Sequence, residues 1–504
     1  MDAIEIELNG ERIVERAASP TTTLLAWIRQ RGLTGTKEGC AEGDCGACTV
    51  AILEEQGQRR FRAVNACLVL LPMVHQKKIW TVEGLETAGQ LHPVQEALVH
   101  ELGSQCGYCT PGVVMSMFEA CYRQDLSEPH QLDDQMCGNL CRCTGYRPIR
   151  DAARAIAGQR PSDRFSAILA GPPEAKALSE AIAPAGGFIP PITGPDASLS
   201  YAAGGQRFFL PRTEAELVEL LGSQPQARIV AGGTDLALEI TKRFEAPPLL
   251  ISRDGIAELA GCADRGDQLF IGATTRLSDL EAYARDALPA LERMLRYFGS
   301  RQIKHRATVG GNLVNASPIG DLPPVFLAHG ATVHTLSPAG RRSIDIDDFF
   351  VGYRKTALRP QEIVTGVSIH KRQGPGVLAT AYKVSKRQEL DISAVAASFV
   401  VELDAAQVVR SARLAYGGMA ATPARARGAE QCLIGRPWSE ALIQEASAAV
   451  ALDFSPISDH RGSSAYRRLV AQNLLRGFYL ETALDPEPRH GPRPTGTLRP
   501  EVIR

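Results

Sequence analysis

The stretch TGTKEGCAEGDCGACTV, at residues 34–50, carries the most informative cysteine pattern in the chain. Its thiols follow the spacing Cys40-x4-Cys45-x2-Cys48, which is typical of plant-type [2Fe–2S] ligands, and Cys67 is available as a fourth. Four thiolates must converge on two irons, so the chain has to curl tightly, and glycines at positions 35, 39, 43 and 46 allow this. The pattern predicts a [2Fe–2S] site, and a structural zinc site or unligated thiols are the alternatives.

A second group of four cysteines follows as Cys106-x2-Cys109 and Cys141-x-Cys143. Each pair comes just before a predicted helix, so two helix starts could hold a cluster between them. Spacing leaves the metal open, because a four-cysteine zinc site fits almost as well as a [2Fe–2S] cluster. Cys137 lies close enough in sequence to compete as a ligand. Cys121 falls inside a predicted helix, where we expect a buried apolar residue.

The cysteines are unevenly distributed along the chain. Ten of the 12 lie between residues 40 and 143, and the rest of the chain holds only Cys262 and Cys432. Extracellular disulfides could explain such density, but the start MDAIEIELNG has neither the basic nor the apolar region of a secretory signal. In a reducing compartment, clustered thiols more often bind metal or carry out redox chemistry. We therefore expect a soluble, cytoplasmic protein.

Composition is typical of a globular multidomain protein. The 504 residues correspond to roughly three domains, and 44% hydrophobic and 22% charged residues are near globular averages. The 55 Lys and Arg against 56 Asp and Glu give a net charge of −1, so no overall attraction to nucleic acid or acidic lipid is expected. The sequence contains no run of 18 apolar residues, so we expect no membrane-spanning helix.

Local patterns divide the chain into segments. Residues 1–80 read as strands around a turn at Asn9-Gly10, and residues 92–158 read as helices. Residues 161–195 hold seven of the 32 prolines, which predicts a linker. Residues 201–480 mix strands and helices in an α+β pattern, and the tail is proline-rich.

Three motifs resemble the iron–sulfur domains of the molybdenum hydroxylases, the xanthine dehydrogenase/oxidase family: CAEGDCGACTV, QCGYCTPG and CGNLCRCTGYRPI. The resemblance implies a β-grasp, plant-ferredoxin-like [2Fe–2S] domain at 1–85 and a helical [2Fe–2S] domain at 86–160. The implied cluster ligands are Cys40, Cys45, Cys48 and Cys67 for the first and Cys106, Cys109, Cys141 and Cys143 for the second. Cys137 would not be a ligand, and Gln105 would contact the pterin of the molybdenum cofactor.

Two glycine pairs in the second half follow expected strands, in IVAGGTDL at 229–236 and TVGGNL at 308–313. Each could present backbone N–H groups to a phosphate, although an ordinary turn at a strand end is the alternative. Neither is a Walker motif or GxGxxG. The segment 374–379 fits GxGxxA, but it leads into a strand-like stretch and is interpreted as a hairpin loop.

Four further segments resemble the flavin part of xanthine dehydrogenases, whose FAD domain is of the vanillyl-alcohol-oxidase type: AGGTDL, FGSRQIKHRATVGGNLVNASPIGDLPP, GYRKT and YKVSKRQELDIS. The implied segments are a proline-rich linker at 161–198, an FAD-binding domain at 199–372, a CO-dehydrogenase-flavoprotein-type α+β domain at 373–482 and a flexible tail at 483–504. The implied FAD contacts are Ile229, Val230, Ala231, Gly232, Gly233, Thr234, Asp235, Phe298, Thr308, Val309, Gly310, Gly311, Asn312, Asp321, Val364 and Lys383. Tyr353 and the Lys386–Asp391 stretch would influence access by NAD⁺. Without the resemblance, Phe298 and Tyr353 would be interpreted as core aromatics.

As a whole, the resemblance implies an α+β multidomain oxidoreductase, the electron-transfer subunit of a xanthine dehydrogenase that converts hypoxanthine to xanthine and urate. Electrons would pass from a molybdenum cofactor on a partner subunit through the helical-domain cluster, then the ferredoxin-type cluster, to FAD and NAD⁺. The chain differs from eukaryotic relatives in stopping after the flavin part, so we expect a separate molybdenum-binding large subunit in a heterotetramer. We expect no catalytic residue of purine hydroxylation here, and no nucleic-acid or membrane partner. The alternatives are a subunit of another molybdenum hydroxylase, acting on an aldehyde, nicotinate or another N-heterocycle, or a zinc-stabilised non-enzymatic assembly protein.

Overall fold

The protein is described by a computed structural model that covers residues 2–55, 58–171 and 198–483. The chain divides into two compact units. The first comprises Met1–Gly261, Thr274–Ser278 and Gly299–Thr308, and the second comprises Cys262–Ala273, Asp279–Phe298 and Val309–Arg504. Most of the expected linker and nearly all of the expected tail lie outside the described residues. The segment expected as one FAD domain, 199–372, is divided between the two units.

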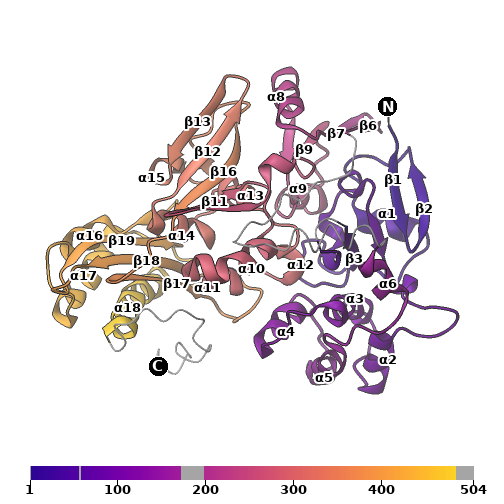
Figure 1. The fold of residues 1–504 in the computed structure, drawn as a ribbon, viewed down its shortest axis with the longest axis horizontal. Helices are drawn as coiled ribbons and strands as arrows, with labels where there is room; N and C mark the ends of the chain where they lie inside the picture. Colours follow the sequence, from indigo (N-terminus) through magenta and orange to yellow (C-terminus); the bar gives the residue numbers. More distant parts are fainter. Residues whose placement is uncertain (1, 56–57, 172–197, 484–504) are drawn as a thin grey trace. The chain divides into compact units, whose positions relative to one another are not determined.

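A five-stranded mixed sheet in the order β2-β1-β5-β3-β4 opens the first unit (Figure 1). Strand β1 pairs antiparallel with β2 and parallel with β5, and β3 pairs antiparallel with β5 and β4. Asn9 and Gly10, both at positive φ, form the predicted turn between β1 and β2. Helix α1 buries Leu24 and Trp27 against the sheet, which confirms the β-grasp prediction. The elements are β1 Ile4–Leu8, β2 Glu11–Glu15, α1 Leu24–Gln30, β3 Thr49–Glu54, β4 Arg60–Asn65, β5 Lys78–Trp80 and the 3-10 turns η1 Ala66–Leu68, η2 Leu71–Val74 and η3 Val82–Gly84.

A helical domain follows, as predicted. Its helices are α2 Pro93–His100, α3 Thr110–Tyr122, α4 Pro129–Met136, α5 Arg147–Ile156 and α6 Arg164–Ala170. Helix α6 corrects the prediction that residues 161–198 are all linker. Phe165 is 1% exposed and packs edge-on against Phe118 of α3, and the Asp163 carboxylate accepts hydrogen bonds from the first turn of α6. Burial of an aromatic ring and an N-cap therefore outweigh the proline-rich composition.

The rest of the first unit is a small α/β sheet in the order β6-β7-β9-β8. Strands β7, β9 and β8 are parallel, and β6 is antiparallel to β7. Val230 and Leu250 from this sheet share one hydrophobic core with residues of the β-grasp domain. The elements are β6 Leu199–Ala203, β7 Gln206–Leu210, α8 Glu214–Ser223, β8 Arg228–Val230, α9 Leu236–Thr241, β9 Leu249–Ser252, η4 Ala257–Leu259 and α12 Arg301–Lys304.

The second unit contains two larger antiparallel sheets and a two-stranded one (Figure 1). The first sheet has the order β10-β11-β16-β12-β13, and its part of the chain contains β10 Cys262–Arg265, β11 Gln268–Gly272, α10 Leu277–Ala287, α11 Pro289–Arg296, α13 Val309–Asn315, α14 Leu322–His329, β12 Thr332–Ser337, β13 Gly340–Asp345, α15 Ile346–Phe349, β14 Phe350–Gly352, β15 Lys355–Thr356 and β16 Ile363–His370. The other sheet, β17-β18-β19-β20, shares a core with three helices. These elements are β17 Val377–Val384, β18 Val395–Leu403, β19 Val409–Gly417, β20 Ala424–Arg425, α16 Arg427–Leu433, α17 Glu440–Asp453 and α18 Ser464–Ala483.

Two local interpretations of the sequence in this unit are wrong. The TVGGNL segment does not end a strand, because helix α13 begins at Val309 and the Gly310 N–H donates to the Ala273 carbonyl at 2.8 Å. The segment 374–379 leads into strand β17 as expected, but β16 and β17 belong to different sheets, so it is not a hairpin loop.

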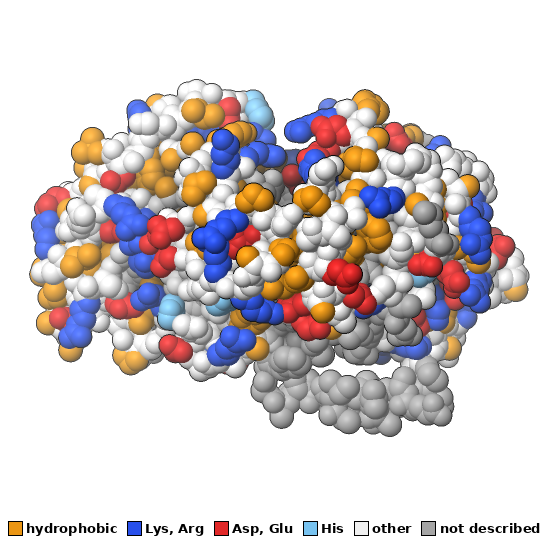
Figure 2. Space-filling model, turned by 90° about the horizontal axis from the view of Figure 1, so that it is seen from above, with side chains coloured by type: hydrophobic (Ala, Val, Ile, Leu, Met, Phe, Trp, Pro, Cys, Tyr) orange, Lys and Arg blue, Asp and Glu red, His pale blue; other side chains and the backbone are white. Residues whose placement is uncertain are grey.

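The surface carries charges of both signs. Figure 2 shows Lys and Arg side chains interspersed with Asp and Glu over one face, in keeping with the net charge of −1. Within the described ranges, no helix is both long enough and apolar enough to cross a bilayer.

Candidate functional site

The four cysteines of the first group meet as two pairs. Cys40, Cys45 and Cys48 lie in the loop between α1 and β3, and Cys67 lies on η1. The thiols of Cys40 and Cys45 are hydrogen-bonded to each other, and so are those of Cys48 and Cys67. Cys48 and Cys67 are buried, whereas the other two thiols are partly exposed. The fold thus brings the three cysteines of the 4-and-2 spacing together with Cys67.

Backbone N–H groups surround the Cys40 sulfur. The amide nitrogens of Glu42 and Cys45 lie 3.5 and 3.3 Å from it. The hydrogen bond from the Cys45 thiol, helped by these amides, lowers the pKa of Cys40 to about 5. The same thiol contact raises the pKa of Cys45. The loop therefore stabilises negative charge on sulfur, which is what a metal-bound thiolate and a cluster sulfide both require.

Gly46 shows why this loop needs glycine. Its φ is +68°, and a Cβ at this position would lie 2.1 Å from the Gly138 carbonyl oxygen. The Gly46 carbonyl accepts hydrogen bonds from Asn139 Nδ2 at 3.0 Å and from Thr49 Oγ1 at 2.6 Å. Position 46 therefore requires glycine because another backbone segment lies so close, and not only because of its positive φ.

The second cysteine group is also paired. The Cys106 thiol is hydrogen-bonded to Cys143, and the Cys109 thiol to Cys141. Cys109 is the N-cap of α3 and Cys143 precedes α5, so two helix starts meet as predicted. Burial, followed by the contact with Cys141, raises the pKa of Cys109 to about 12.

The paired arrangement bears on the choice between zinc and a [2Fe–2S] cluster. Among the described residues, no group of three or more His, Cys, Asp or Glu side chains converges on one metal position. A structural zinc ion needs four ligands around one point, whereas each iron of a [2Fe–2S] cluster takes two thiolates. Two pairs of thiols are therefore compatible with a [2Fe–2S] cluster. Cys121 is fully buried in α3, as expected. The Cys137 thiol donates to the Asp134 carbonyl, and its exclusion from the ligands stays a prediction.

The two cysteine groups are linked through the main chain. The Leu140 N–H, directly before Cys141, donates to the Cys45 carbonyl oxygen at 2.9 Å. One hydrogen bond therefore joins a residue of the first group to the neighbour of a residue of the second.

The helical domain exposes side chains both at the second cysteine group and elsewhere on its surface. Cys106 and Cys143 are exposed, and so is Gln105, which precedes Cys106. This domain also exposes the large apolar side chains of Leu91, Val99, Leu102, Tyr108, Leu140 and Tyr146. An exposed thiol pair with exposed apolar side chains is typical of a surface that meets another protein.

In the first unit, the glycine loop at 229–235 packs closely on its surroundings. A Cβ on Gly232 would lie 1.7 Å from the Arg306 carbonyl oxygen, so only glycine fits. In the described part of the chain, no hydrogen bond engages the amide N–H groups of Gly232, Gly233 or Thr234. Consecutive free amides are the donor set that a pyrophosphate requires, and the loop follows strand β8 as predicted.

This loop and the helix after it also contact the first cysteine group. Gly233 lies against the carbonyl oxygen of Leu68, which follows Cys67. At the end of α9, Thr241 Oγ1 donates to the Ala41 carbonyl at 2.7 Å and Lys242 Nζ to the Cys40 carbonyl at 3.0 Å. The predicted phosphate loop and the predicted cluster loop are therefore neighbours.

In the second unit, two predicted FAD contacts hold each other. Lys383 Nζ, which is 3% exposed, donates to Asp321 Oδ2 and to the Tyr297 carbonyl, both at 2.9 Å. Ser393 Oγ donates to the other Asp321 oxygen at 2.5 Å. Asn312 Oδ1, by contrast, is buried with no hydrogen-bond partner among the described residues, so it is available to a ligand.

Neither of the two aromatic residues named as candidate contacts lies in the hydrophobic core. Phe298 is half-buried and Tyr353 is 63% exposed, so neither is a core aromatic. Val364 is 1% exposed and paired with Thr335 in a β-bulge, so only its backbone could reach a ligand. The Lys386–Asp391 stretch lies between β17 and β18, where the Asp391 carboxylate accepts a hydrogen bond from the Arg387 N–H.

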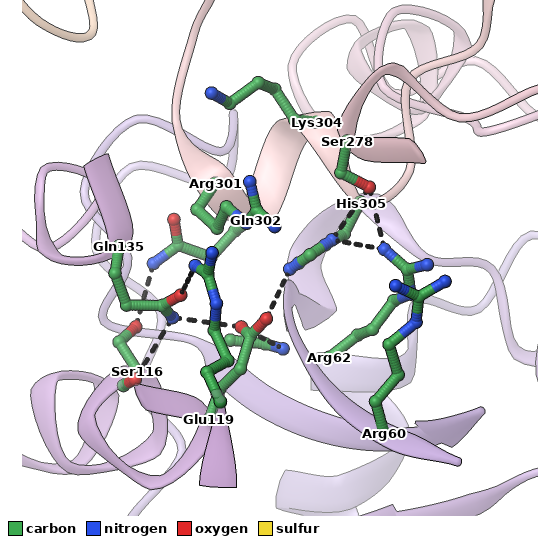
Figure 3. A network of polar contacts seen from close by, with 12 residues as sticks. Arg60, Arg62, Ser116, Glu119, Gln135, Ser278, Arg301, Gln302, Lys304 and His305 are labelled. Carbon is green, nitrogen blue, oxygen red and sulfur yellow. Dashed lines mark hydrogen bonds and ion pairs between the residues drawn. The ribbon is translucent and has the colours of Figure 1, made fainter. Parts of the chain in front are cut away.

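A buried polar network, shown in Figure 3, is the feature that sequence reasoning missed. Gln302 Nε2 donates to Asn139 Oδ1 and to Ser116 Oγ, both at 2.9 Å. Lys304, fully buried, pairs with Asp134 at 2.5 Å. These contacts fix the segment 299–308 against the helical domain and, through Asn139, against Gly46. Asn139 lies inside the CGNLCRC motif, which is the one signal that could have found it.

His305 is the centre of this network. Its Nε2 lies 2.7 Å from Glu119 Oε1, and its Nδ1 lies 2.8 Å from Arg62 Nη1 and 3.0 Å from Ser278 Oγ (Figure 3). Since Arg62 can only donate, Nδ1 accepts and Nε2 carries the proton, which makes the ring neutral. Burial, which outweighs the attraction of Glu119, lowers the pKa of His305 to about 3.

Consecutive parts of the chain match four known domain families. Residues 6–71 match the 2Fe-2S iron-sulfur cluster binding domain and residues 81–154 match the [2Fe-2S] binding domain. Residues 202–371 match the FAD binding domain in molybdopterin dehydrogenase, and residues 380–482 match the CO dehydrogenase flavoprotein C-terminal domain. The chain therefore contains two [2Fe–2S] domains and an FAD-binding domain.

Several proteins with similar sequences are named as xanthine dehydrogenases. The chain is 34% identical over 520 residues to xanthine dehydrogenase/oxidase of Rattus norvegicus, covering 95% of this chain and 39% of the relative. It is 33% identical over 529 residues to xanthine dehydrogenase of Emericella nidulans, covering 95% of this chain and 38% of the relative. The chain thus spans about two fifths of the length of these relatives.

A solved structure resembles part of the chain. It is a chain of the carbon monoxide dehydrogenase from Hydrogenophaga pseudoflava that lacks the Mo-pyranopterin moiety of the molybdenum cofactor. The identity is 28% and the TM-score is 0.51, with 53% of this chain and 94% of that chain covered.

Proposed function

Because the chain belongs to the molybdenum hydroxylase family and carries its iron–sulfur and flavin domains, we propose that it is the electron-transfer subunit of a xanthine dehydrogenase. One observation supports the xanthine assignment above the others. Relatives named xanthine dehydrogenase align over 95% of this chain, so they contain both iron–sulfur domains and the flavin part in the same order. The carbon monoxide dehydrogenase chain aligns with only 53% of it.

The ligands proposed for the two clusters are the residues that the fold pairs. Cys40 with Cys45 and Cys48 with Cys67 would hold one [2Fe–2S] cluster, and Cys106, Cys109, Cys141 and Cys143 would hold the other. When bound, the clusters and FAD supply one-electron and two-electron carriers between a molybdenum centre and NAD⁺. The amides of Glu42 and Cys45 stabilise charge on the Cys40 sulfur, and Gly46 holds the loop closed.

The chain's own residues provide matching groups for FAD. The free amides of Gly232, Gly233 and Thr234 would bind its pyrophosphate, and Asn312 Oδ1 supplies an unpaired acceptor. Asp321 and Lys383 form an ion pair at 2.9 Å, and the resemblance implies that both contact FAD. Phe298 would lie against the adenine, with the other FAD contacts as the resemblance implies. Tyr353 and the Lys386–Asp391 stretch would influence access by NAD⁺.

The partner proposed for this chain is a molybdenum-cofactor-binding subunit, and the whole would be a heterotetramer. The support is the exposed part of the helical domain that carries Gln105, Cys106 and Cys143 together with exposed apolar side chains. Burial against a partner would shield the second cluster from water, and Gln105 would contact the pterin there. A cytoplasmic location remains a prediction.

The decisive experiment combines composition with turnover. The chain is purified together with its molybdenum-binding partner, and iron, sulfide, zinc and FAD are measured per chain. We expect about four iron and one FAD, two irons for each cluster, and xanthine-dependent reduction of NAD⁺. Turnover of an aldehyde, nicotinate or another heterocycle but not xanthine would replace the substrate assignment and keep the electron-transfer role. Zinc without flavin or iron would overturn both.

A further inference from the structure

A small, strongly charged cavity lies in the first unit, and none of the residues that line it is a cysteine. Its volume is about 30 Å³, and it is bordered by strands β3 and β4, the turn η2 and the segments around Arg276 and Arg306. A single water needs about 10–15 Å³ measured with a water-sized probe, so the cavity has room for about two waters. Its charged and titratable lining is Glu54, Arg62, Lys77, Arg276, His305 and Arg306.

The cations of this lining outnumber the anions. Glu54, 4% exposed, is the one carboxylate in the lining, and both of its oxygens are occupied, by Arg62 and by Arg276 at 2.6 Å. Arg306 is paired with Asp254 at 2.8 Å. His305 adds no compensating charge, because its Nδ1 accepts from Arg62 and the ring is neutral (Figure 3). Every anion near the cavity is therefore already committed to an arginine.

Lys77 is left over. Its ammonium lines the cavity but makes no hydrogen bond and no ion pair with any described residue. Burial, and then the neighbouring Arg276 charge, lowers its pKa. An ammonium in such a place costs free energy unless an anion offsets it or it loses its proton. The ammonium of Lys77 has three N–H donors without an acceptor, so it can bind an anion.

We propose that this cavity binds a small inorganic anion of the size of chloride, held by the Lys77 ammonium and the guanidinium groups of Arg276 and Arg306. The volume excludes a nucleotide. Bound there, the anion would balance the excess positive charge beneath the Gly232 loop, because Arg306 Nε also donates to the Gly232 carbonyl at 3.3 Å. An alternative source of the same negative charge is a phosphate of bound FAD, so the test has to separate the two.

Lys77 has a matched neighbour for this test. Lys78 is the next residue, carries the same charge, and forms a partly exposed ion pair with Glu55 at 3.0 Å. Lys77→Met removes the ammonium from the cavity, whereas Lys78→Met removes an equal charge from the surface. Both substitutions keep an unbranched side chain of similar length.

The experiment uses the FAD-loaded protein with its partner. Crystals are grown with bromide in place of chloride, and anomalous scattering locates the halide. We expect a bromide peak within contact of Lys77 Nζ in the wild type and in Lys78→Met, separate from the FAD density, and no peak in Lys77→Met. In parallel, bromide or chloride titrations at constant ionic strength follow the unfolding midpoint. Lys77→Met should weaken the anion affinity about tenfold or more, as expected for the loss of one charged hydrogen bond.

Three outcomes would overturn the proposal. They are density continuous with an FAD phosphate in the cavity, water alone with Lys77 uncharged, or the same halide response in Lys77→Met and the wild type. None of them touches the proposed electron-transfer role, which is tested by iron, FAD and turnover.

Discussion

The backbone N–H of Leu140 and the carbonyl oxygen of Cys45 form a hydrogen bond of 2.9 Å between two loops that carry the two groups of cysteines. A main-chain bond does not depend on the Leu140 side chain, which is exposed. The two loops therefore keep their relation as long as both are folded, and a disturbance of one should reach the other.

Hydrogen exchange can detect this link. We expect the Leu140 amide to exchange much more slowly than the amide of Gly89, which lies in an exposed loop. Cys141→Ser should accelerate exchange at Leu140 and at the Cys45 loop together. Rapid exchange at Leu140 in the intact holoprotein would contradict the hydrogen bond.

Single cysteine substitutions should separate ligands from bystanders. Cys106→Ser is expected to lower the iron content from about four to about two per FAD, because one cluster loses a thiolate and the other is untouched. Cys137→Ser serves as the control, since Cys137 lies in the same segment but is not a proposed ligand, and it should retain about four irons. Equal loss of iron in both variants would move Cys137 into the ligand set.

Gly232 gives a test of the flavin loop. Gly232→Ala places a methyl group 1.7 Å from the Arg306 carbonyl, so the loop must shift, and we expect loss of most bound FAD. The control is Gly477→Ala in helix α18, where nothing lies within 4 Å and alanine should stabilise the helix by about 1 kcal/mol. FAD absorbance per chain is the measurement. Full flavin content in Gly232→Ala would argue against this loop as the cradle.

The neutral state of His305 predicts a dependence of stability on pH. Its pKa is lowered to about 3, so between pH 6.5 and 3 the unfolded chain binds a proton that the folded chain does not. Stability should therefore fall as the pH drops below about 6.5, by at most about 1.4 kcal/mol per pH unit. Protonation of Glu119 lowers the stability further only below pH 4.5, the ordinary pKa of a glutamate. In Glu119, burial would raise the pKa, but His305 and Arg301 outweigh it and hold the pKa low.

Denaturant midpoints at pH 7.5, 6.5 and 5.5 measure this effect. His305→Gln keeps an acceptor for Arg62 and a donor for Glu119 and cannot titrate, so its decline with pH should be shallower than that of the wild type. His100→Gln, at an exposed position, should follow the wild type. Parallel declines for all three proteins would show that another group controls acid stability.

The contact from Gln302 to Asn139 should influence the first cluster, since Asn139 holds the Gly46 carbonyl. Gln302→Ala is expected to shift the EPR signal or the reduction potential of the ferredoxin-type cluster, and Gln302→Glu should restore at most part of it, because a carboxylate cannot donate to Asn139. A purely structural role would lower stability and leave the signal unchanged. Arg265→Ala, at an exposed surface position, provides a control.

Short-range patterns predicted much of this architecture. The Asn9-Gly10 turn and the proline at the start of α3 each act within one turn, and both were confirmed. The 4-and-2 cysteine spacing acts within one loop, and its ligand assignment stays a prediction. The predicted linker failed at α6, because the burial of Phe165 depends on a groove that only the folded helical domain provides. The TVGGNL segment failed for the same kind of reason, since its Gly310 N–H is bound by Ala273 from another element.

In the candidate site, too, the local patterns were predictable and the long-range contacts were not. The sequence could predict which four cysteines form each group. It could not predict which two thiols of a group pair with each other, because the fold determines that. The buried network was beyond prediction from one sequence, because Lys304 and His305 resemble ordinary surface residues of a basic segment. Their partners, Asp134 and Glu119, are separated from them by 170 and 186 residues.

That separation has a consequence during synthesis. The helical domain leaves the ribosome with the carboxylates of Asp134 and Glu119 facing a space that Lys304 and His305 will occupy later. At about 5–20 residues per second, the wait for a partner 186 residues downstream lasts about 10–40 s. During this interval Glu119 has partners only within the iron–sulfur half, the Ala63 N–H and the Gln135 amide, and Asp134 lacks its Lys304 partner. We therefore expect the iron–sulfur half to reach its final packing only after the flavin half has been translated.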